Sequence, residues 1–187
     1  MCMVSEEPEE PNCSYDPMFS SLDDNFILLI ASDNMRYKIH SGILSATSGF
    51  FRDMITLPQT SNGPDSITLC ETSKVMEILL RMISGLEVPM WDSYDDIEDV
   101  LEAAHKYDMP GPVSVIRLMI TSPKFLHDPL RLFAVAARFD WGEEAKLASR
   151  LTLTLSIHDK KYETTLKRLS SPYLLKLMNL HRTRITV

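Results

Sequence analysis

The stretch KIHSGILSATSGFFRDMI, residues 38–55, places a histidine, three serines and an aspartate within eighteen positions. A histidine that activates a serine would make a hydrolase, provided the two side chains lie about 2.6–3.2 Å apart and a third group orients the base. Ser41 directly follows His40, and neighbouring side chains at a strand end diverge. Since no third group stands at a recognisable spacing, we expect His40 to bond backbone groups at a strand-to-helix corner. The alternative is a hydrolase that uses His40 and a nearby serine.

Other catalytic and metal-binding chemistries have no matching pattern. No two of the six glycines fall within six positions of each other, which excludes a P-loop and a dinucleotide fingerprint. The three cysteines lack the spacing of metal ligands. The carboxylates of residues 92–102 lack the glycine and spacing of a calcium loop, and we expect a solvated helix start. We likewise expect the histidines outside the first stretch to be solvated surface residues, at positions 105, 127, 158 and 181. We therefore predict a protein that is not an enzyme and has no cofactor, metal or small-molecule substrate.

Charge is unevenly distributed along the 187 residues. Residues 1–24 hold seven acids and no Lys or Arg, whereas residues 142–187 hold nine Lys or Arg and four acids. The net charge of −7 argues against nucleic acid as a partner, because such binding depends on neutralising phosphates. No apolar run is longer than the six residues 26–31, which are too few to cross a membrane. Without a secretory signal or a disulfide framework, we expect an intracellular protein of the cytoplasm or nucleus.

The elements that position these residues begin with a hairpin. Residues 26–31 are apolar on both faces, which predicts a central strand, and residues 35–40 alternate as a half-buried strand does. Residues 41–56 predict two short helices with a break at Ser48 or Gly49, and residues 66–71 predict a short strand. No strand is expected in residues 1–22, whose Glu, Pro, Ser and Asn content indicates disorder.

Helices follow this first part. Amphipathic patterns predict helices over residues 73–85 and 93–109, and a further helix that starts at Gly111-Pro112. In the first of these, Gly85 fits the position after the helix end. The C-terminal part reads as helices alone, over residues 128–141, 142–156 and 162–181.

Two signatures in this order of elements resemble the BTB/POZ domain. The first runs from an acid before the hairpin through the helix pair, and its matching residues are Asp24, Tyr37, Ile39, His40, Leu44, Ser48, Phe51 and Met54. The second is AAHKYDM at residues 103–109, which is similar to a later family signature containing Lys, Tyr and Met. Residues 50–59 and 123–145 are similar to a fungal branch of the family. The resemblance covers about residues 17–182.

The resemblance implies an α+β fold, a small mixed sheet covered by helices and followed by an all-helical extension. We accordingly divide the chain into a disordered acidic tail (1–22), a BTB/POZ domain (23–121) and a helical extension packed on it (122–187). The resemblance also implies protein–protein interaction without catalysis, with homodimers or larger oligomers. Structural roles are implied for the motif residues, Asp24, His40, Leu44, Ser48, Phe51 and Met54. We predict a module that self-associates through this domain.

The alternative function is a substrate adaptor of a cullin-RING ubiquitin ligase, because some family members bind cullins. Its candidate partner surface is Leu57, Pro58 and Tyr94, together with the helices of residues 128–156. Cullin-binding members often carry a hydrophobic-x-Glu element after the second helix, and residues 54–64 contain no acid. The sequence also departs from the family pattern at Ser41, where Lys or Arg is common and forms a charged pocket with the early acid. This departure weakens the assignment of Asp24 to such a pocket.

Overall fold

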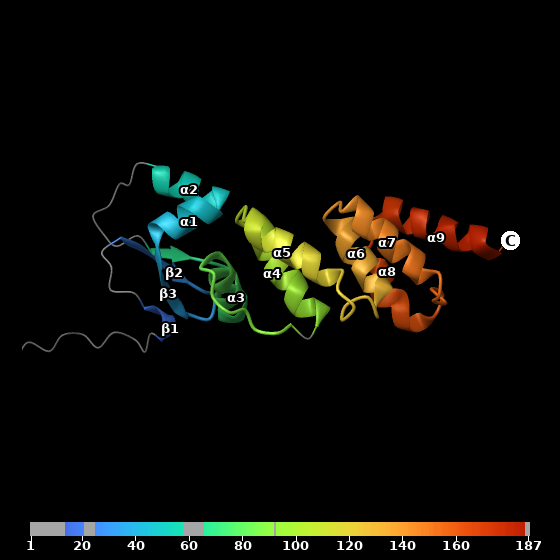
Figure 1. Ribbon diagram of the computed structural model, residues 1–187, viewed down its shortest axis with the longest axis horizontal. Helices are drawn as coiled ribbons and strands as arrows, with labels where there is room; N and C mark the ends of the chain where they lie inside the picture. Colours follow the sequence, from blue (N-terminus) through green and yellow to red (C-terminus); the bar gives the residue numbers. More distant parts are fainter. Residues whose placement is uncertain (1–13, 21–24, 58–65, 92, 186–187) are drawn as a thin grey trace, which may run out of the picture. The chain divides into compact units, whose positions relative to one another are not determined.

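The computed structural model describes residues 14–20, 25–57, 66–91 and 93–185, and Figure 1 shows its helices and strands. By their contacts the residues fall into two units. The first comprises Met1–Met90 with Asp99–Val113, and the second comprises Trp91–Glu98 with Ser114–Val187. Helices α4 (Tyr94–Lys106) and α5 (Pro110–Ile120) contribute residues to both units. Helix α5 begins one residue before the predicted Gly111-Pro112 start.

A four-stranded mixed sheet forms part of the first unit. Its strands are β1 (Tyr15–Ser20), β2 (Phe26–Ile30), β3 (Arg36–His40) and β4 (Ser66–Thr68), in the order β1-β3-β2-β4. The predicted hairpin is confirmed: β2 and β3 pair antiparallel, and β2 lies inside the sheet. Asn34 makes the turn with a φ of 65°, a conformation that asparagine tolerates better than most residues. The other two pairings, β1 with β3 and β2 with β4, are parallel.

Strand β1 corrects the expectation that residues 1–22 contain no strand. Tyr15–Ser20 pairs with β3, and the ring of Phe19 is buried edge-on against Tyr37, with the ring centroids 6.0 Å apart. Pro17 is tolerated because β1 is an edge strand, where a missing N–H costs no ladder bond. The proline and the nearby acids are atypical of a strand, and Phe19 is the residue of β1 that is buried. The sequence pattern therefore did not predict this strand. The remainder of the predicted tail, residues 1–13 and 21–22, lies outside the described residues.

Three helices accompany the sheet in the first unit, α1 (Ser41–Thr47), α2 (Gly49–Thr56) and α3 (Ser73–Ile83). The predicted break between the first two falls at Ser48. Helix α3 buries Val75, Ile78 and Leu79, as its apolar spacing predicts. Gly85 follows it with a φ of 68°, the left-handed conformation that commonly ends a helix.

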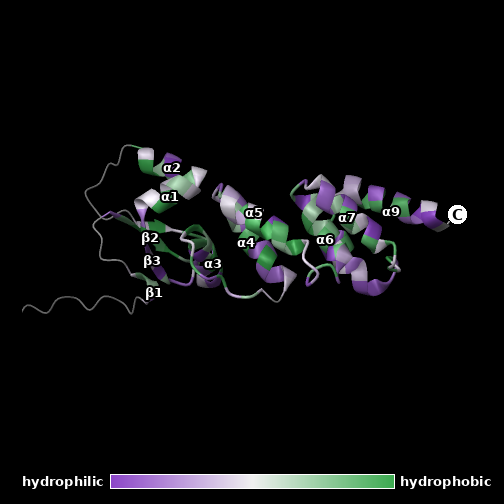
Figure 2. Ribbon diagram, viewed as in Figure 1, coloured by the Kyte–Doolittle hydropathy of each residue, from purple (hydrophilic) through white to green (hydrophobic). Residues whose placement is uncertain are grey.

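The second unit is helical in its described residues. It contains α6 (Pro129–Arg138), α7 (Gly142–Thr152), the short 3-10 turn η1 (Lys160–Tyr162), α8 (Glu163–Lys167) and α9 (Ser171–Ile185). Asp128 accepts a hydrogen bond from the Arg131 N–H and so caps α6, with Pro129 in the first turn. Helix α6 is mostly apolar and α9 mostly polar, as the colours of Figure 2 show. Helix α6 is accordingly the buried centre of this unit.

Helix α9 contacts its neighbours through polar groups and through apolar side chains, among them the ring of Tyr173, which packs edge-on against Phe133 on α6. Tyr173 donates a hydrogen bond of 2.5 Å to Asp140, Leu177 is buried, and His181 lies 3.2 Å from the hydroxyl of Thr152. The expectation that His181 is solvated is therefore wrong, because its side chain is only 7% exposed. The basic residues near His181 in the sequence suggested a solvent-exposed face of α9. The imidazole instead lies on the face of α9 that packs against Thr152 of α7.

Candidate protein-interaction site

The break between α1 and α2 is tied to the turn after α4. Ser48 accepts a hydrogen bond from the Phe51 N–H and donates one of 2.5 Å to the carbonyl of Tyr107. The Gly49 N–H donates to the carbonyl of Asp108 at 2.9 Å. A Cβ at Gly49 would lie 1.8 Å from the carboxylate of Asp108, so any other residue here would have to displace that side chain. These hydrogen bonds to the carbonyls of Tyr107 and Asp108 therefore fix the helix pair to the turn after α4.

Aromatic stacking joins the two sequence signatures at the same point. The rings of Phe51 and Tyr107 stack with their centroids 5.1 Å apart, and both side chains are buried. The Tyr107 hydroxyl donates to Glu71, which also forms an ion pair of 2.7 Å with Lys106. Burial alone would raise the pKa of Glu71, but the hydrogen bonds from Lys106 and Tyr107 outweigh burial and lower its pKa. Both signatures can be found in the sequence, but the stacking of Phe51 on Tyr107 could not be predicted from them.

His40 caps helix α1. Its Nδ1 accepts a hydrogen bond of 3.0 Å from the Gly42 N–H, which confirms the predicted bond to the backbone. Ser41 donates to Asn25 and Ser45 donates to the carbonyl of Gly42. Neither serine hydroxyl of this described stretch donates to the imidazole. The side chain of His40 is exposed, so the strand-to-helix corner that it caps lies at the surface.

The remaining motif residues lie at different depths. Leu44 is fully buried and Met54 is half-buried on α2. Asp24 and Pro58 lie outside the described residues. Leu57, directly after α2, is 64% exposed. Of the expected partner surface after the helix pair, Leu57 is therefore the residue that the structure describes as accessible.

Tyr94, the third residue of the expected partner surface, is buried in the chain. Its side chain is only 7% exposed, and its ring packs edge-on against Phe125 with the centroids 5.3 Å apart. The hydroxyl donates to the carbonyl of Phe125 at 2.8 Å, and burial raises the pKa of the phenol. The expectation of an exposed Tyr94 is wrong because the first turn of α4 is covered by residues that follow α5.

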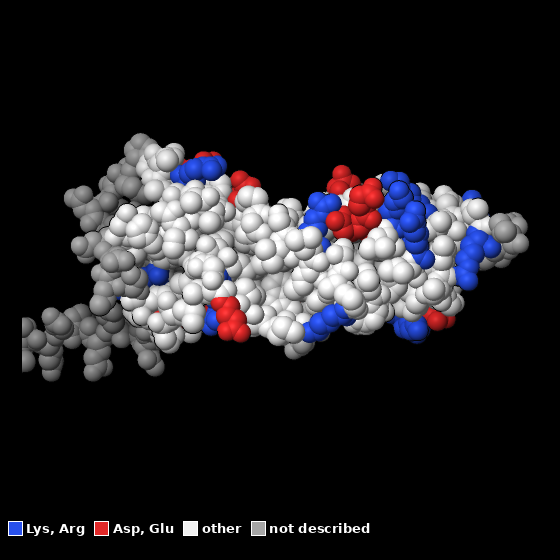
Figure 3. Space-filling model, in the orientation of Figure 1, with Lys and Arg blue, Asp and Glu red and all other residues white. Residues whose placement is uncertain are grey.

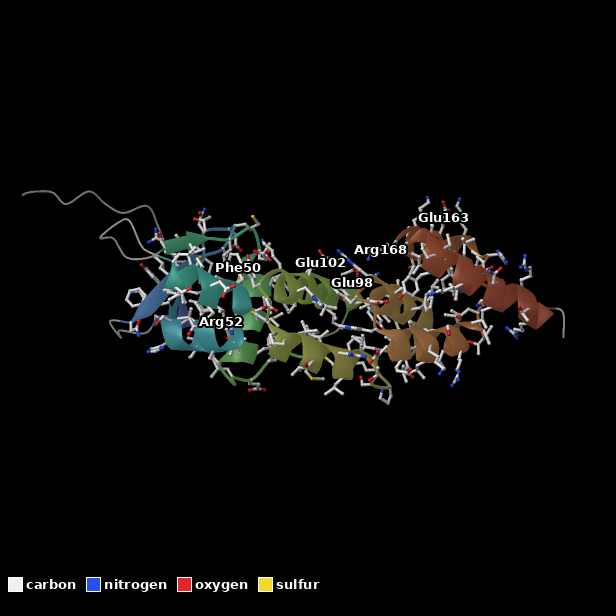
Figure 4. All side chains as sticks on the ribbon, turned by 90° about the horizontal axis from the view of Figure 1, so that it is seen from above. Phe50, Arg52, Glu98, Glu102, Glu163 and Arg168 are labelled. Atoms are coloured by element: carbon white, nitrogen blue, oxygen red, sulfur yellow. The ribbon has the colours of Figure 1, made fainter. Side chains whose placement is uncertain are left out.

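A buried carboxylate also corrects the expected solvated acids of α4. Glu98 is 8% exposed and accepts hydrogen bonds from Arg131 and, at 2.9 Å, from Arg168. Figure 4 shows the side chains of Glu98 and Arg168 directed toward each other. Asp95 pairs with Arg131 as well. The sequence contains a signal for this burial, because Tyr94 and Leu101 stand about one turn before and after Glu98 on the same helix.

An apolar surface remains open on α2. Phe50 is 44% exposed, although one edge of its ring meets Phe51 and Tyr107. Figure 4 shows Phe50 with Arg52 on this helix. Together with Met54 and Leu57, Phe50 forms what we call the α2 surface. Large apolar side chains gathered on one helix are typical of a contact with another protein.

Metal-binding clusters and membrane-spanning helices are both absent from the described residues. No group of three or more His, Cys, Asp or Glu side chains is placed there to hold a metal ion. The helices of that part of the chain are each too short or too polar to cross a membrane. Figure 3 shows Lys and Arg side chains interspersed with acids on the face that it draws, rather than one continuous basic area.

This domain combines a four-stranded mixed sheet, the helix pair α1 and α2, and the turn after α4 that is bonded to that pair. The family model of the BTB/POZ domain matches residues 23–123, and the chain belongs to this family. BTB/POZ domains are protein–protein interaction modules and are generally non-enzymatic. A search of the curated proteins found no match to the chain. The family assignment therefore rests on the domain itself.

Proposed function

We propose that this BTB/POZ chain is a non-enzymatic interaction module that self-associates through its α2 surface. The observation that carries the proposal is the exposure of Leu57 and Phe50 next to a rigidly held core. Because Ser48 and Gly49 fix α2 to the turn after α4, the surface needs little reordering when a second copy binds. The same patch on both copies would form a two-fold, self-complementary contact.

One exposed charge of α2 lies beside this surface. Asp53 stands three positions after Phe50 and is on the same side of the helix, whereas Arg52, two positions after Phe50, is on the other side. A charge at the rim of a contact contributes about 0–1 kcal/mol, so Asp53 would influence orientation more than affinity.

Sedimentation equilibrium of variants tests the proposal. Leu57→Glu places a charge in the contact and is expected to weaken self-association by at least about tenfold. Thr56→Glu adds the same charge at the neighbouring exposed position and serves as the matched control. Leu57 contributes little to the core, so the variant is expected to keep the wild-type melting temperature. Equal association of wild type and Leu57→Glu would reject the α2 surface.

The adaptor function has one supporting observation, the exposure of Leu57. Of the other two residues expected to contact a cullin, Tyr94 is buried and Pro58 lies outside the described residues. Titration with a purified cullin N-terminal domain separates the two functions. Binding that Leu57→Glu removes, with no self-association of the chain alone, would favour the adaptor. No binding at about tens of micromolar would reject it.

A further inference from the structure

A cavity of about 360 Å³ opens between helices α7 and α9. Its apolar lining includes Phe133 on α6, Ala145 on α7 and Leu177 on α9, which belong to the buried core. The half-buried Leu180 on α9 completes it. The volume lies at the lower end of the range for ligand sites, enough for one large side chain with its backbone. We call this cavity the α7–α9 groove.

Each wall of the α7–α9 groove carries a lysine. Lys146 stands on α7 and Lys176 on α9, and neither has an acidic partner among the described residues. The ammonium of Lys176 lies 4.9 Å from the centre of the Tyr173 ring, which also lines the groove. No Asp or Glu is part of the lining. The groove therefore combines an apolar floor with positive charge on both sides.

A second cavity in this unit shows that the charge pattern is specific. It has a volume of about 510 Å³ and lies on the other side of α9, beside Leu174 and Met178. Both signs of charge line it, and its Glu163 and Lys167 form an ion pair of 2.6 Å. It offers no preference for an acidic or a basic ligand, whereas the α7–α9 groove does.

We propose that the α7–α9 groove binds a short acidic peptide segment of a partner protein, with one large apolar side chain as its anchor. The anchor fills the cavity, and acids on its two sides pair with Lys146 and Lys176. The lining residues of each wall span about two helical turns, or roughly 10 Å, the length of about three extended residues. The segment therefore needs only one anchor and its flanking acids. This site is separate from the α2 surface and does not depend on self-association.

Glycine 142 provides a way to block the groove without disturbing the core. It lines the groove at the start of α7, and a Cβ placed on it would meet no atom within 4 Å. A larger side chain can therefore be introduced here without a clash at its Cβ, and tryptophan is large enough to reach into the groove that Gly142 lines. The steric variant Gly142→Trp thus complements the charge variant Lys146→Glu with Lys176→Glu.

The probe is the fluorescently labelled peptide Glu-Glu-Phe-Glu-Glu, and anisotropy at low salt is measured with the full chain. We expect saturable binding with a Kd below about 1 mM. The double lysine variant should weaken binding by about tenfold or more, because it replaces two attractions with two repulsions. Gly142→Trp should weaken it at least about fivefold, as should a central serine in place of the phenylalanine.

The controls separate this site from general charge attraction. Lys160→Glu with Lys161→Glu changes the net charge of the same unit equally but lies outside the groove, and it should bind within about twofold of wild type. Leu57→Glu should bind as wild type does, which keeps the result independent of self-association. Each variant must show the wild-type circular dichroism spectrum. No saturable binding by the wild type, equal binding by Gly142→Trp, or equal binding of the serine peptide would overturn the proposal.

Discussion

Ser48 and Tyr107 lie 59 positions apart in the chain and are joined by a buried hydrogen bond of 2.5 Å from the serine hydroxyl to the tyrosine carbonyl. Each belongs to a different family signature, so the two signatures meet at one point of the core. The same hydroxyl accepts the Phe51 N–H and caps α2. One small side chain thereby sets the position of the helix that carries the α2 surface.

Replacing this hydroxyl should be costly. Ser48→Ala removes a helix cap and leaves the buried Tyr107 carbonyl without its donor, for an expected loss of about 1–3 kcal/mol in the free energy of unfolding. Urea denaturation followed by circular dichroism measures this. The matched control is Ser45→Ala, because Ser45 bonds locally to the Gly42 carbonyl at an accessible position. A loss no larger than that of the control would contradict a docking role for Ser48.

The cap at His40 should matter less. His40→Ala removes one bond to the Gly42 N–H at an exposed position, and water can replace the lost acceptor. We expect a cost of about 0.5–1 kcal/mol, the usual value for an exposed N-cap. His40→Asn restores a short acceptor and should recover most of it. A loss above about 3 kcal/mol would show that the imidazole is part of the core.

Removing the charge of the buried Glu98 should lower the free energy of unfolding more than removing the His40 cap. Glu98→Gln keeps the size of the side chain but removes the charge that Arg131 and Arg168 face. The free energy of unfolding should fall by about 2–3 kcal/mol, because two guanidinium groups lose a charged acceptor at a partly buried site. Asp99→Asn, at the next and exposed position of α4, is the control. Thermal unfolding of the two variants should separate clearly, and equal melting temperatures would refute the packing role of Glu98.

Protonation of His181 should weaken the attachment of α9. Burial, followed by the charges of Arg184 and His158, lowers the pKa of His181. The unfolded chain, whose histidine has a pKa of about 6.5, therefore takes up a proton before the folded chain does. The stability contributed by the neutral imidazole is present above pH 6.5 and is lost as the pH falls toward the folded pKa. The stability advantage of wild type over His181→Gln, measured by urea denaturation at a series of pH values, should therefore shrink over this range.

Much of the fold could be predicted from local patterns. The hairpin, the helix pair with its break at Ser48, and α3 with Gly85 after its end all follow from periodicity and caps. Strand β1 could not, because its pattern contains a proline and its burial depends on the distant ring of Tyr37. Long-range contacts of this kind leave no period in the sequence.

The interaction site was predictable only in part. The positions of Leu44 and Phe51 in the core follow from their spacing, whereas the exposure of Phe50 next to Phe51 depends on how α2 is oriented. Tyr94 and Glu98 were misplaced because polarity suggested solvent for residues that other segments cover. A buried polar group is stable only with its partners, and those partners are more than thirty positions away for each of these two residues.

Sedimentation equilibrium of the wild-type chain over a wide concentration range tests the central claim most directly. The monomer has a mass of 21.3 kDa. Self-association through the α2 surface predicts an average mass that rises with concentration from this value toward about double, as a two-fold contact requires. A mass that stays at that of the monomer up to about 0.5 mM, more than a hundredfold above a micromolar Kd, would contradict the proposed function.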